Sequence, residues 1–520
     1  MSDSNAPRAA RRRGPATLHG AVARQALLRP DAIALVHGEK RVGYAELDAA
    51  ADSFAAVLQD LGVRPGHRVP VLLPRSPELV AVLLAVLKCG AAYAAVDHRW
   101  PVERVRSVLR TLDTPVLVAD PTDTALAVPA WAPPPGGLPA AVAAGGAPRP
   151  TDVDGAAPAM VFFTSGTTGT PKGVLSPHRA TLRLFSGPTF ADFGPGRVMP
   201  QAAPVPWDAF GLELWGMLTT GGCSVIVDRD QLFPDDLRDL VKSAAVDTLW
   251  LTASLFNLFV DEDLDSFTGV RQVMTGGERL SVPHVRAFLQ RFPQTALLNG
   301  YGPVESCVFV TTRAVRPADC GLPGGIPVGR PVPGTAVHLL HGTASVPADE
   351  QGEICVAGDG LALGYLGDPA ATAERFVTVR FDGVPTRLYR TGDLGRLDEA
   401  GVLHFVGRAD RQVKISGYRV EPAEIEATAL TLPGVRECAV VPVPGPDGTV
   451  DRLALFYTAD AEAEEPGRIR DALAARLPHY MVPPTVRRTA GLPRTANGKL
   501  DRAALCDRLG ATASNPTTGE

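Results

Sequence analysis

The spacing of apolar residues predicts helices that alternate with short buried strands through most of the chain. Between Tyr44 and Leu61, apolar positions recur at intervals of three and four residues, as on a helix that buries one face; they are Leu47, Phe54, Ala55, Val57 and Leu58. Arg68–Leu73 is an apolar run typical of a buried strand, and Ser76–Cys89 has the helical period again. Further strands are predicted at Ala91–Val96, Thr114–Ala119, Ala159–Thr164, Ser224–Val227 and Asp247–Thr252. This alternation favours an α/β fold with largely parallel sheets.

The pattern changes after Gly352. Three short β runs follow one another: Gly352–Gly358, Arg387–Asp393 and Val402–Arg408. The last hundred residues then combine two predicted helices with two predicted strands: Pro422–Leu430, Gly467–Leu477, Cys438–Val443 and Arg452–Thr458. This mixture predicts a separate small α+β domain. The charged, turn-like stretch Gly407–Arg411 is the predicted boundary.

Composition identifies the segments that are predicted to lie outside the packed elements. Residues 1–14 carry four arginines and no apolar run after them, which predicts a disordered basic tail and argues against a secretory signal. Pro121–Ala157 is rich in Ala, Pro and Gly and is expected to be a surface connection. The domain prediction is therefore a large N-terminal domain over 15–409, a small one over 410–509 and a second tail over 510–520.

Charge and cysteine usage exclude several classes of function. Lys and Arg number 51 against 56 Asp and Glu, which argues against a general nucleic-acid-binding protein. No apolar run approaches the roughly 18 residues that span a bilayer, so no membrane partner is predicted. Seven scattered cysteines without a CxxC pair argue against a zinc site or a disulfide framework and favour a cytoplasmic protein.

The strongest local motif is Phe163–Gly173, FTSGTTGTPKG, which follows a predicted apolar strand. Its glycines allow backbone N–H groups to close on an anion, and the hydroxyls and Lys172 add further donors. The spacing differs from that of a Walker A loop, so a P-loop nucleotidase is disfavoured. The motif predicts a phosphate-binding loop of another kind.

Three further motifs carry polar chemistry. Asn299–Glu305 places an aromatic ring between glycines and a carboxylate soon after, a combination suited to a flat ring and a divalent cation. Tyr389–Leu394 contains Asp393, which can accept from ribose hydroxyls, and Gly407–Gly417 contains the cations Arg408 and Lys414. Asn497–Arg502 has an Asn-Gly turn that presents Lys499. Alone, each of these motifs would be interpreted as an ordinary turn or an exposed charge.

In order and spacing, the four motifs together resemble the signature set of the adenylate-forming enzymes, and more narrowly the amino-acid adenylation domains of nonribosomal peptide synthetases. The resemblance runs from about Leu18 to Leu509. It implies a large domain of two α/β subdomains and a β-barrel-like subdomain, followed by a small mobile α+β domain. It also implies two half-reactions: a carboxylate attacks the α-phosphorus of ATP to form an acyl-adenylate and pyrophosphate, and a phosphopantetheine thiol then displaces AMP.

By motif position, the resemblance implies roles for individual residues. Lys499 would contact the substrate carboxylate and the α-phosphate, Glu305 would help to hold Mg²⁺, and Asp410 would be the hinge about which the small domain rotates. The β- and γ-phosphates would be held by Thr164, Ser165, Gly166, Thr167, Thr168, Gly169 and Lys172. The rest of the nucleotide would be bound by Gly277, Glu278, Gly300, Tyr301, Gly302, Asp393, Phe405 and Arg408. Val304 stands where many members have a threonine, so one hydroxyl contact to the α-phosphate is either absent here or supplied by another residue.

The stretch Val205–Gly216 resembles the segment that begins the family's specificity pocket. Asp208 falls where a carboxylate pairs with the substrate's α-ammonium; a plain helix cap is the alternative interpretation. The implied lining is Asp208, Ala209, Leu212, Trp250, Met274, Gly276, Gly300, Val308 and Phe309, closed by Lys499. Apart from Asp208 and Lys499 this lining is uncharged, which predicts a short aliphatic amino acid. Valine is favoured, while 2-aminobutyrate, isoleucine and leucine stay open, because one methylene is worth only about 1–3 kcal/mol.

The predicted partners are the amino acid and a separate phosphopantetheinyl carrier protein, with an MbtH-like helper protein as a further candidate. No carrier segment follows Lys499, so a stand-alone enzyme is expected. Two alternatives stay open at this point. One is an acyl-CoA or aryl-acid ligase of the same fold, and the other is a catalytically silent binding subunit.

Overall fold

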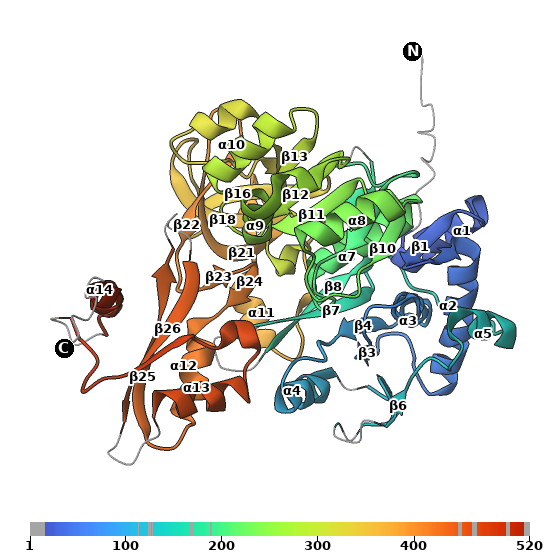
Figure 1. Cartoon of the computed structure of the whole chain (residues 1–520), viewed down its shortest axis with the longest axis horizontal. Helices are drawn as coiled ribbons and strands as arrows, with labels where there is room; N and C mark the ends of the chain where they lie inside the picture. Colours follow the sequence, from blue (N-terminus) through green and yellow to red (C-terminus); the bar gives the residue numbers. More distant parts are fainter. Residues whose placement is uncertain are drawn as a thin grey trace.

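The computed structural model shows a large N-terminal domain and a small C-terminal domain that lie side by side (Figure 1). It describes residues 16–112, 114–122, 126, 128–166, 171–187, 190–445, 450–459, 465–495 and 500–513. The predicted tail over residues 1–14 lies outside the described residues. The mixed α/β class with its small additional domain agrees with the prediction.

A seven-stranded sheet forms one layer of the large domain, with the strand order β19-β8-β7-β4-β3-β5-β6. Its strands are β3 (Arg68–Val71), β4 (Ala92–Ala95), β5 (Leu117–Val118), β6 (Ala130–Trp131), β7 (Pro158–Thr164), β8 (Lys172–Pro177) and β19 (Gly364–Tyr365). The helices of this region are α1 (Leu18–Leu28), α2 (Tyr44–Asp60), α3 (Pro77–Lys88), α4 (Val102–Leu112), α5 (Gly137–Ala144) and α6 (His178–Leu182). The strands from β6 to β7 pair in parallel, as the strand–helix alternation predicted.

Two smaller sheets complete the α/β part. One is four-stranded, β2-β1-β10-β9, and the other is five-stranded, β11-β12-β13-β14-β15. Their strands are β1 (Ile33–His37), β2 (Lys40–Gly43), β9 (Val198–Gln201), β10 (Cys223–Ile226), β11 (Thr248–Thr252), β12 (Gln272–Gly276), β13 (Ala296–Tyr301), β14 (Thr311–Ala314) and β15 (Arg330–Pro331). The associated helices are α7 (Asp208–Thr220), α8 (Pro234–Ala244), α9 (Ala253–Asp263) and α10 (Val282–Arg291). Because β11, β12 and β13 are parallel, their carboxyl ends meet at one edge.

The third part of the large domain is an antiparallel six-stranded sheet that takes the place of the predicted β-barrel-like subdomain. Its order is β17-β16-β18-β21-β20, with β22 paired to β21. The elements are β16 (Thr335–His341), β17 (Ala344–Ser345), β18 (Gln351–Gly358), α11 (Pro369–Arg375), β20 (Phe376–Phe381), β21 (Val384–Leu397) and β22 (Leu403–Arg408). The pair β21–β22 brings Asp393 opposite Arg408.

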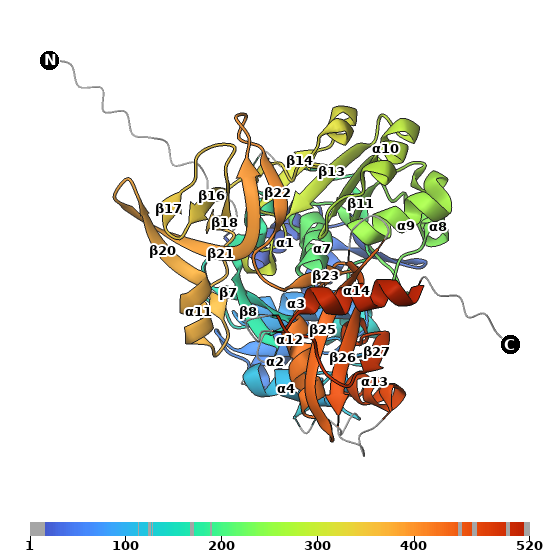
Figure 2. The same cartoon turned by 90° about the vertical axis from the view of Figure 1, so that its left-hand side faces the viewer.

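The small domain is a three-stranded sheet covered by helices on both faces, preceded by a hairpin. Alternate residues of β25 point to opposite sides, so Val440 packs with α12 and α13 while Ala439 and Val441 pack with Leu505 of α14. Figure 2 shows α12 and α14 beside β25 and β26. The elements are β23 (Val413–Ile415), β24 (Tyr418–Val420), α12 (Pro422–Leu430), β25 (Val435–Pro444), β26 (Val450–Ala459), α13 (Pro466–Ala474), β27 (Thr485–Arg488) and α14 (Arg502–Ala513).

Three expectations from the sequence are wrong in detail. The segment Pro121–Ala157 contains packed structure, because β6 pairs with β5 and α5 buries Leu138 against the core that includes α2. Residues 510–513, which were predicted to belong to the second tail, lie in α14. Val57 is 39% exposed and lies off the buried face of α2.

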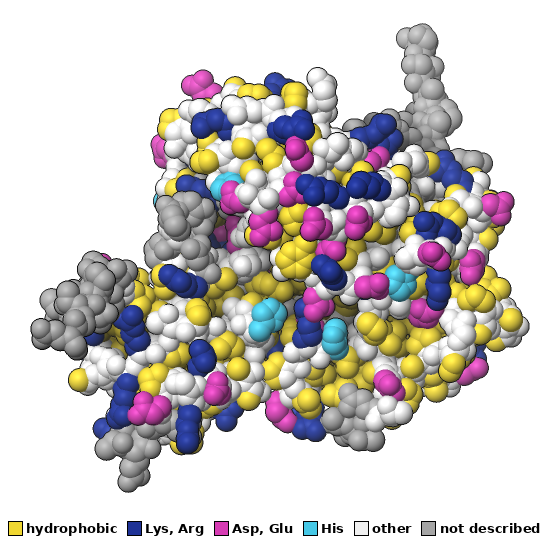
Figure 3. Space-filling model, viewed as in Figure 1, with side chains coloured by type: hydrophobic (Ala, Val, Ile, Leu, Met, Phe, Trp, Pro, Cys, Tyr) yellow, Lys and Arg dark blue, Asp and Glu magenta, His cyan; other side chains and the backbone are white. Residues whose placement is uncertain are grey.

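The surface carries both signs of charge. On the face shown in Figure 3, Lys and Arg side chains are interspersed with Asp and Glu side chains. All seven cysteines are free thiols. Within the described residues, no helix combines the length and the apolar character needed to cross a bilayer.

Helix α7 begins at the site described below and is buried along nearly its whole length, from Ala209 to Thr219. It carries Glu213, whose carboxylate is fully buried and accepts from Ala203 N at 2.9 and 3.1 Å. Burial raises the pKa of Glu213 to about 8. The folded protein therefore favours the protonated, uncharged form of Glu213.

We predict that Glu213→Gln removes a pH-dependent loss of stability. The folded pKa lies above the ordinary value of 4.5, so the penalty is absent below pH 4.5 and grows until about pH 8. Between pH 5 and pH 8.5 the wild type should lose on the order of 2–4 kcal/mol relative to the variant, because each pKa unit is worth ~1.4 kcal/mol. Urea unfolding at the two pH values measures this difference. Parallel pH dependences in the two proteins would contradict it.

Candidate active site

A cavity lies between the two domains, beside the carboxyl ends of β7, β11 and β13. The large domain lines it with Thr164, Ser165, Asp208, Ala209, Trp250, Gly277, Gly300, Gly302, Val308, Phe309, Asp393 and Arg408, among others. The small domain contributes Gln412, Lys414, Gly417, Tyr418, Arg419 and Tyr480. Crevices at the carboxyl ends of parallel strands are the usual ligand sites of α/β sheets. The cavity is therefore lined by many of the residues that the motifs singled out.

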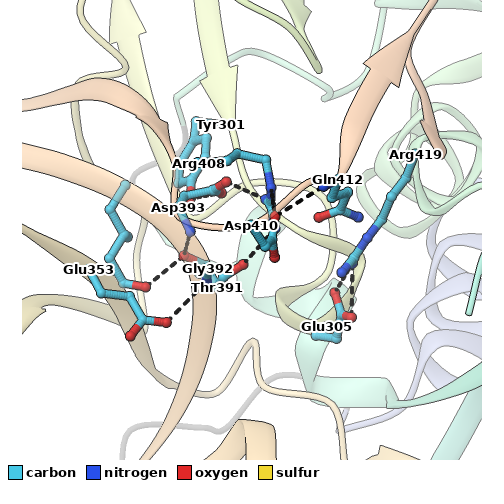
Figure 4. Close-up of polar contacts among 11 residues, drawn as sticks. Tyr301, Glu305, Glu353, Thr391, Gly392, Asp393, Arg408, Asp410, Gln412 and Arg419 are labelled. Carbon is cyan, nitrogen blue, oxygen red and sulfur yellow. Dashed lines mark hydrogen bonds and ion pairs between the residues drawn. The ribbon is translucent and has the colours of Figure 1, made fainter. Parts of the chain in front are cut away.

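Asp393 is the centre of a buried polar network at one end of the cavity (Figure 4). Tyr301 donates its hydroxyl to Asp393 Oδ2 at 2.6 Å, and Arg408 Nη1 forms an ion pair with Oδ1. A carboxylate has about four acceptor positions, so Asp393 can still accept from a ligand hydroxyl. Burial, followed by the charge of Asp393, raises the pKa of Tyr301 well above its ordinary value. Tyr301 is therefore a neutral donor that orients the carboxylate.

Arg408 links this network to the connection between the domains. Its Nε and Nη2 donate to Asp410 at 2.7 and 2.8 Å, and Asp410 Oδ1 also accepts from Gln412 N at 3.2 Å (Figure 4). Burial would raise the pKa of Asp410, but the hydrogen bond and charge of Arg408 lower it overall. Asp410 thus ties the start of the small domain to the end of β22. Its predicted role as hinge stays a prediction.

Glu305 lies in the wall of the large domain and is paired with a cation from the small domain. It is 1% exposed, and both of its oxygens accept from Arg419 Nη1 at 2.9 Å (Figure 4). Tyr365 donates its hydroxyl to Oε1 at 2.8 Å. Burial alone would raise the pKa of Glu305, but the Arg419 charge and the Tyr365 hydrogen bond outweigh it and lower the pKa. The carboxylate is therefore ionised in this arrangement.

The carboxylate of Glu305 is a suitable ligand for Mg²⁺, but Arg419 is already paired with it. Mg²⁺ is commonly bound by one or two carboxylates together with substrate phosphates and water. Among the described residues no group of three or more His, Cys, Asp or Glu could hold a metal ion, so the protein would supply few ligands. Arg419 occupies both oxygens of Glu305 in the present arrangement. Because the guanidinium and Mg²⁺ are both cations, their repulsion would favour withdrawal of Arg419 when Glu305 contacts the ion.

The hairpin β23–β24 carries Arg419 into the cavity. Its turn is Ser416-Gly417, with φ of +51° and +85°, as in a type I′ turn. Gly417 N donates to Glu278 Oε1 at 2.9 Å, and a Cβ at Gly417 would lie 2.5 Å from Thr252 Cγ2. Tyr418 packs on Trp207 and stacks on Tyr480, with ring centroids 4.5 and 3.8 Å apart. The hairpin can approach Thr252 this closely because Gly417, at its tip, has no side chain.

The start of the predicted phosphate loop is also held by the small domain. Gly166 N donates to Glu424 Oε2 at 2.9 Å, and Ser165 Oγ donates to Arg419 O at 3.0 Å. The other oxygen of Glu424 is paired with Arg104 of α4 at 2.7 Å, and both side chains are buried. A carboxylate therefore occupies a backbone N–H donor that the sequence assigned to a phosphate. Thr167, Thr168 and Gly169 lie outside the described residues.

The opposite end of the cavity is apolar apart from Asp208. Asp208 is the first residue of α7, and its Oδ2 accepts from Val308 N at 2.8 Å. Burial raises the pKa of Asp208, opposed by this hydrogen bond. No described cation forms an ion pair with it. Beside it, the Phe309 ring covers Gly300 so closely that a Cβ there would lie 2.1 Å from the ring.

The structure brings together most of the predicted residues and leaves a few behind the cavity wall. Leu212 and Met274 are fully buried in the core, and Gly276 pairs with Gly300 inside the sheet. Phe405 packs near Tyr301 with ring centroids 6.2 Å apart. Gly302 allows a close approach, because a Cβ there would lie 2.3 Å from Val308 O. Lys499 lies outside the described residues.

Sequence reasoning missed Arg419, Glu424 and Tyr418, which bring the small domain into the cavity. A signal for one of them was present. Ser416-Gly417 between two β-forming runs indicates a two-residue hairpin, which places Lys414 and Arg419 opposite each other on one face. Lys414 lines the cavity, and burial lowers its pKa against the opposing charge of Asp393. The pair could therefore have been predicted as two neighbouring cations.

Comparison with known proteins defines the class. The model of the AMP-binding enzyme family matches residues 22–366, and that of the AMP-binding enzyme C-terminal domain matches residues 424–499. The chain therefore belongs to the AMP-binding enzyme family, and its two domains have the adenylate-forming fold. The domain boundary at 409/410 lies between the two matches and stays a prediction.

Individual relatives narrow the class to adenylation domains of nonribosomal peptide synthetases. Malpibaldin synthetase of Mortierella alpina is 39% identical over 484 residues, which is 92% of this chain but 9% of the relative. The solved structure of holo-PA1221, an NRPS protein with adenylation and PCP domains, has a TM-score of 0.87 at 37% identity and covers 95% of this chain and 84% of that one. NpsA of Klebsiella oxytoca with 3-hydroxyanthranilyl-AMSN has a TM-score of 0.70 at 27% identity, with coverages of 95% and 99%. The chain thus spans a small fraction of the long synthetase that it matches.

We predict that Gly417→Ala loosens the docking of the hairpin. The added methyl would collide with Thr252, and the backbone φ of +85° disfavours any residue with a side chain. Amides of 413–420 should exchange hydrogen about tenfold faster, the equivalent of ~1.4 kcal/mol of docking free energy. Hydrogen–deuterium exchange with peptide resolution measures this.

The matched control is Gly467→Ala in α13, where an added Cβ meets nothing within 4 Å. It should leave the exchange of 413–420 unchanged. Equal protection of the hairpin in wild type and Gly417→Ala would show that the contact with Thr252 does not hold the domains together.

Proposed function

We propose that this chain activates a small aliphatic α-amino acid, with valine as the favoured substrate, and loads it onto a carrier protein. ATP would convert the amino acid to its aminoacyl-adenylate, and the thiol of a separate phosphopantetheinyl carrier protein would then take the acyl group. The named domains of PA1221, adenylation and PCP, support a carrier as partner. An MbtH-like helper remains a further candidate.

The observation that carries this proposal is that no described cation forms an ion pair with the carboxylate of Asp208. This carboxylate lies in an otherwise apolar part of the cavity, and its hydrogen bond from Val308 N fixes its orientation. A partly buried carboxylate in an apolar surrounding loses hydration, and this loss is unfavourable unless a cation compensates it. An α-ammonium group would supply the missing charge. A substrate without the amino group would leave Asp208 uncompensated.

The size of the pocket supports a short side chain. Phe309 fills the space above Gly300, and Trp250, which is 7% exposed, forms another part of the wall. A polar side chain would lose hydrogen bonds to water and find few partners here. A branched three-carbon side chain meets these limits better than an aromatic or charged one.

The opposite end of the cavity suits the nucleotide. Asp393 would accept from the ribose hydroxyls, with Tyr301 and Arg408 holding its carboxylate. Glu305 would contribute to a Mg²⁺ site, and a bound divalent cation neutralises phosphate charge during such a transfer. Ser165, Gly166 and Lys172 would contact the phosphates together with the rest of their loop. Lys499 would stabilise the charge that develops between the acid and the α-phosphate.

The arrangement of the small domain supports a role after pyrophosphate has left. Arg419 occupies the carboxylate that would face the metal ion, and Glu424 occupies the Gly166 N–H that would face a phosphate. Both contacts are incompatible with a fully loaded ATP site. The hairpin would therefore withdraw for adenylate formation and return for thioester formation, by rotation about Asp410.

A second candidate is the activation of an aryl acid. The solved complex of NpsA with 3-hydroxyanthranilyl-AMSN is the observation that favours it. Asp208 is what weighs against it, because an aryl carboxylate brings no α-ammonium group to the pocket. The variant described next separates the two candidates.

We predict that Asp208→Asn lowers valine-dependent ATP–pyrophosphate exchange about 100- to 1,000-fold in kcat/KM, as expected for the loss of a buried charge partner. Exchange with the des-amino acid 3-methylbutanoate should change far less. The control is Asp235→Asn, whose carboxylate is 91% exposed. Equal losses with both acids would remove Asp208 from ammonium recognition.

We predict that Lys499→Ala lowers adenylate formation about 100-fold or more, in line with the loss of one donor at a developing charge. Transfer from a chemically supplied aminoacyl-adenylate to the carrier should be retained, because the hairpin then occupies the site. Lys242→Ala on the exposed face of α8 is the control. Undiminished exchange in Lys499→Ala would exclude the assigned role.

A further inference from the structure

Arg183 is a buried cation that none of the sequence motifs accounts for. It follows α6 and is 6% exposed. Its guanidinium donates to four backbone carbonyls and has no ion-pair partner among the described carboxylates. Nη1 donates to Ala180 O at 2.9 Å, and Nη2 donates to Ser306 O at 2.7 Å, Phe309 O at 2.7 Å and, at 3.5 Å, Cys307 O.

The segment that Arg183 holds has an unfavourable backbone. Cys307 and Val308 have φ of +53° and +61°, in the left-handed region that residues with a Cβ rarely adopt. For the β-branched Val308 this is a marked outlier. Such conformations persist only where surrounding contacts fix them. Besides Arg183, Thr181 Oγ1 contacts Cys307 Sγ at 3.2 Å. Two residues of the same short stretch, Thr181 and Arg183, therefore hold the segment.

The strained segment supplies two parts of the substrate pocket. Val308 N donates to Asp208 and so orients the carboxylate. Phe309 covers Gly300 and closes the pocket, and its ring packs against Phe190 with centroids 5.4 Å apart. If the segment relaxed to ordinary φ values, both the N–H and the ring would move.

We propose that Arg183 is a positioning residue for the amino-acid pocket, acting by clamping Ser306–Phe309 in its left-handed conformation. The planar guanidinium is needed because it bridges a carbonyl of α6 on one side and three carbonyls of Ser306–Phe309 on the other. Gly360 makes room for it, since a Cβ at Gly360 would lie 2.4 Å from Arg183 Nε. A lysine has a single donor centre and cannot make this bridge. The inference rests on the proposed function for the identity of its ligand.

The test compares Arg183→Lys and Arg183→Met with wild type in ATP–pyrophosphate exchange, using valine or, where the wild type prefers another acid, that acid. The KM for the amino acid should rise about tenfold or more, because small displacements of a binding group are costly. The KM for ATP should stay within about twofold. Preference for valine over leucine should also fall, since Phe309 no longer closes the pocket. Arg179→Met in α6 is the control, because the described structure shows no side-chain hydrogen bond for Arg179.

A rescue variant separates positioning from general stability. Cys307→Gly introduced into Arg183→Lys should restore part of the affinity for the amino acid, because glycine adopts a positive φ without a clamp. A loss of kcat with both KM values unchanged, or an equal rise in both, would overturn the proposal, as would an identical effect of Arg179→Met. A wild type that exchanges with no acid would instead contradict the proposed function, so the two failures are distinguishable.

Discussion

The arrangement of the site depends on how three carboxylates in or beside one cavity are neutralised. Asp393 and the partly buried Asp208 line the cavity, and the buried Glu305 is paired with Arg419, which also lines it. An isolated buried carboxylate is costly, so each requires a donor or a cation nearby. Arg408 from the adjacent strand satisfies Asp393, and Arg419 from the small domain satisfies Glu305. Asp208 accepts from a backbone N–H, and no described cation forms an ion pair with it; we propose that the substrate's ammonium group supplies the missing charge.

The same electrostatics connects the two domains. Arg419 and Glu424 place a cation and an anion of the small domain on Glu305 and on Gly166 N, two groups that are proposed to face the nucleotide. Glu424 also forms an ion pair with Arg104 of α4, so a second element of the large domain takes part in this contact. Under that proposal, docking of the hairpin and full occupation of the nucleotide site would compete for the same atoms. Competition of this kind lets ligand charge bias the position of a domain.

Much of the fold could be predicted because its elements are local. The periodicity of Tyr44–Leu61 predicted α2 to within one residue, and Pro422–Leu430 was predicted with the bounds that α12 has. Helix α5 was missed because its Ala- and Gly-rich sequence is typical of a loop, although Leu138 and Ala141 are buried. Its stability comes from packing on α2 and not from its own periodicity.

Contacts in the site could be predicted where both residues belong to the recognised motifs. Tyr301, Asp393 and Arg408 are the example. Contacts could not be predicted where the partners are distant and no motif names both. Glu305 and Arg419 are 114 residues apart, and Arg104 and Glu424 are 320 apart. Arg183 contacts Phe309 across 126 residues, and nothing in its neighbourhood marks it as functional. Tertiary packing alone brings these pairs together.

The central claim is that the missing cation of Asp208 is the substrate's ammonium group. A crystal structure with a non-hydrolysable valyl-adenylate analogue tests it most directly. The account predicts the ammonium nitrogen within about 3 Å of an Asp208 carboxylate oxygen, with the side chain against Phe309. An ammonium group that faces away from Asp208, or an analogue that binds with its acyl part outside this pocket, would contradict it.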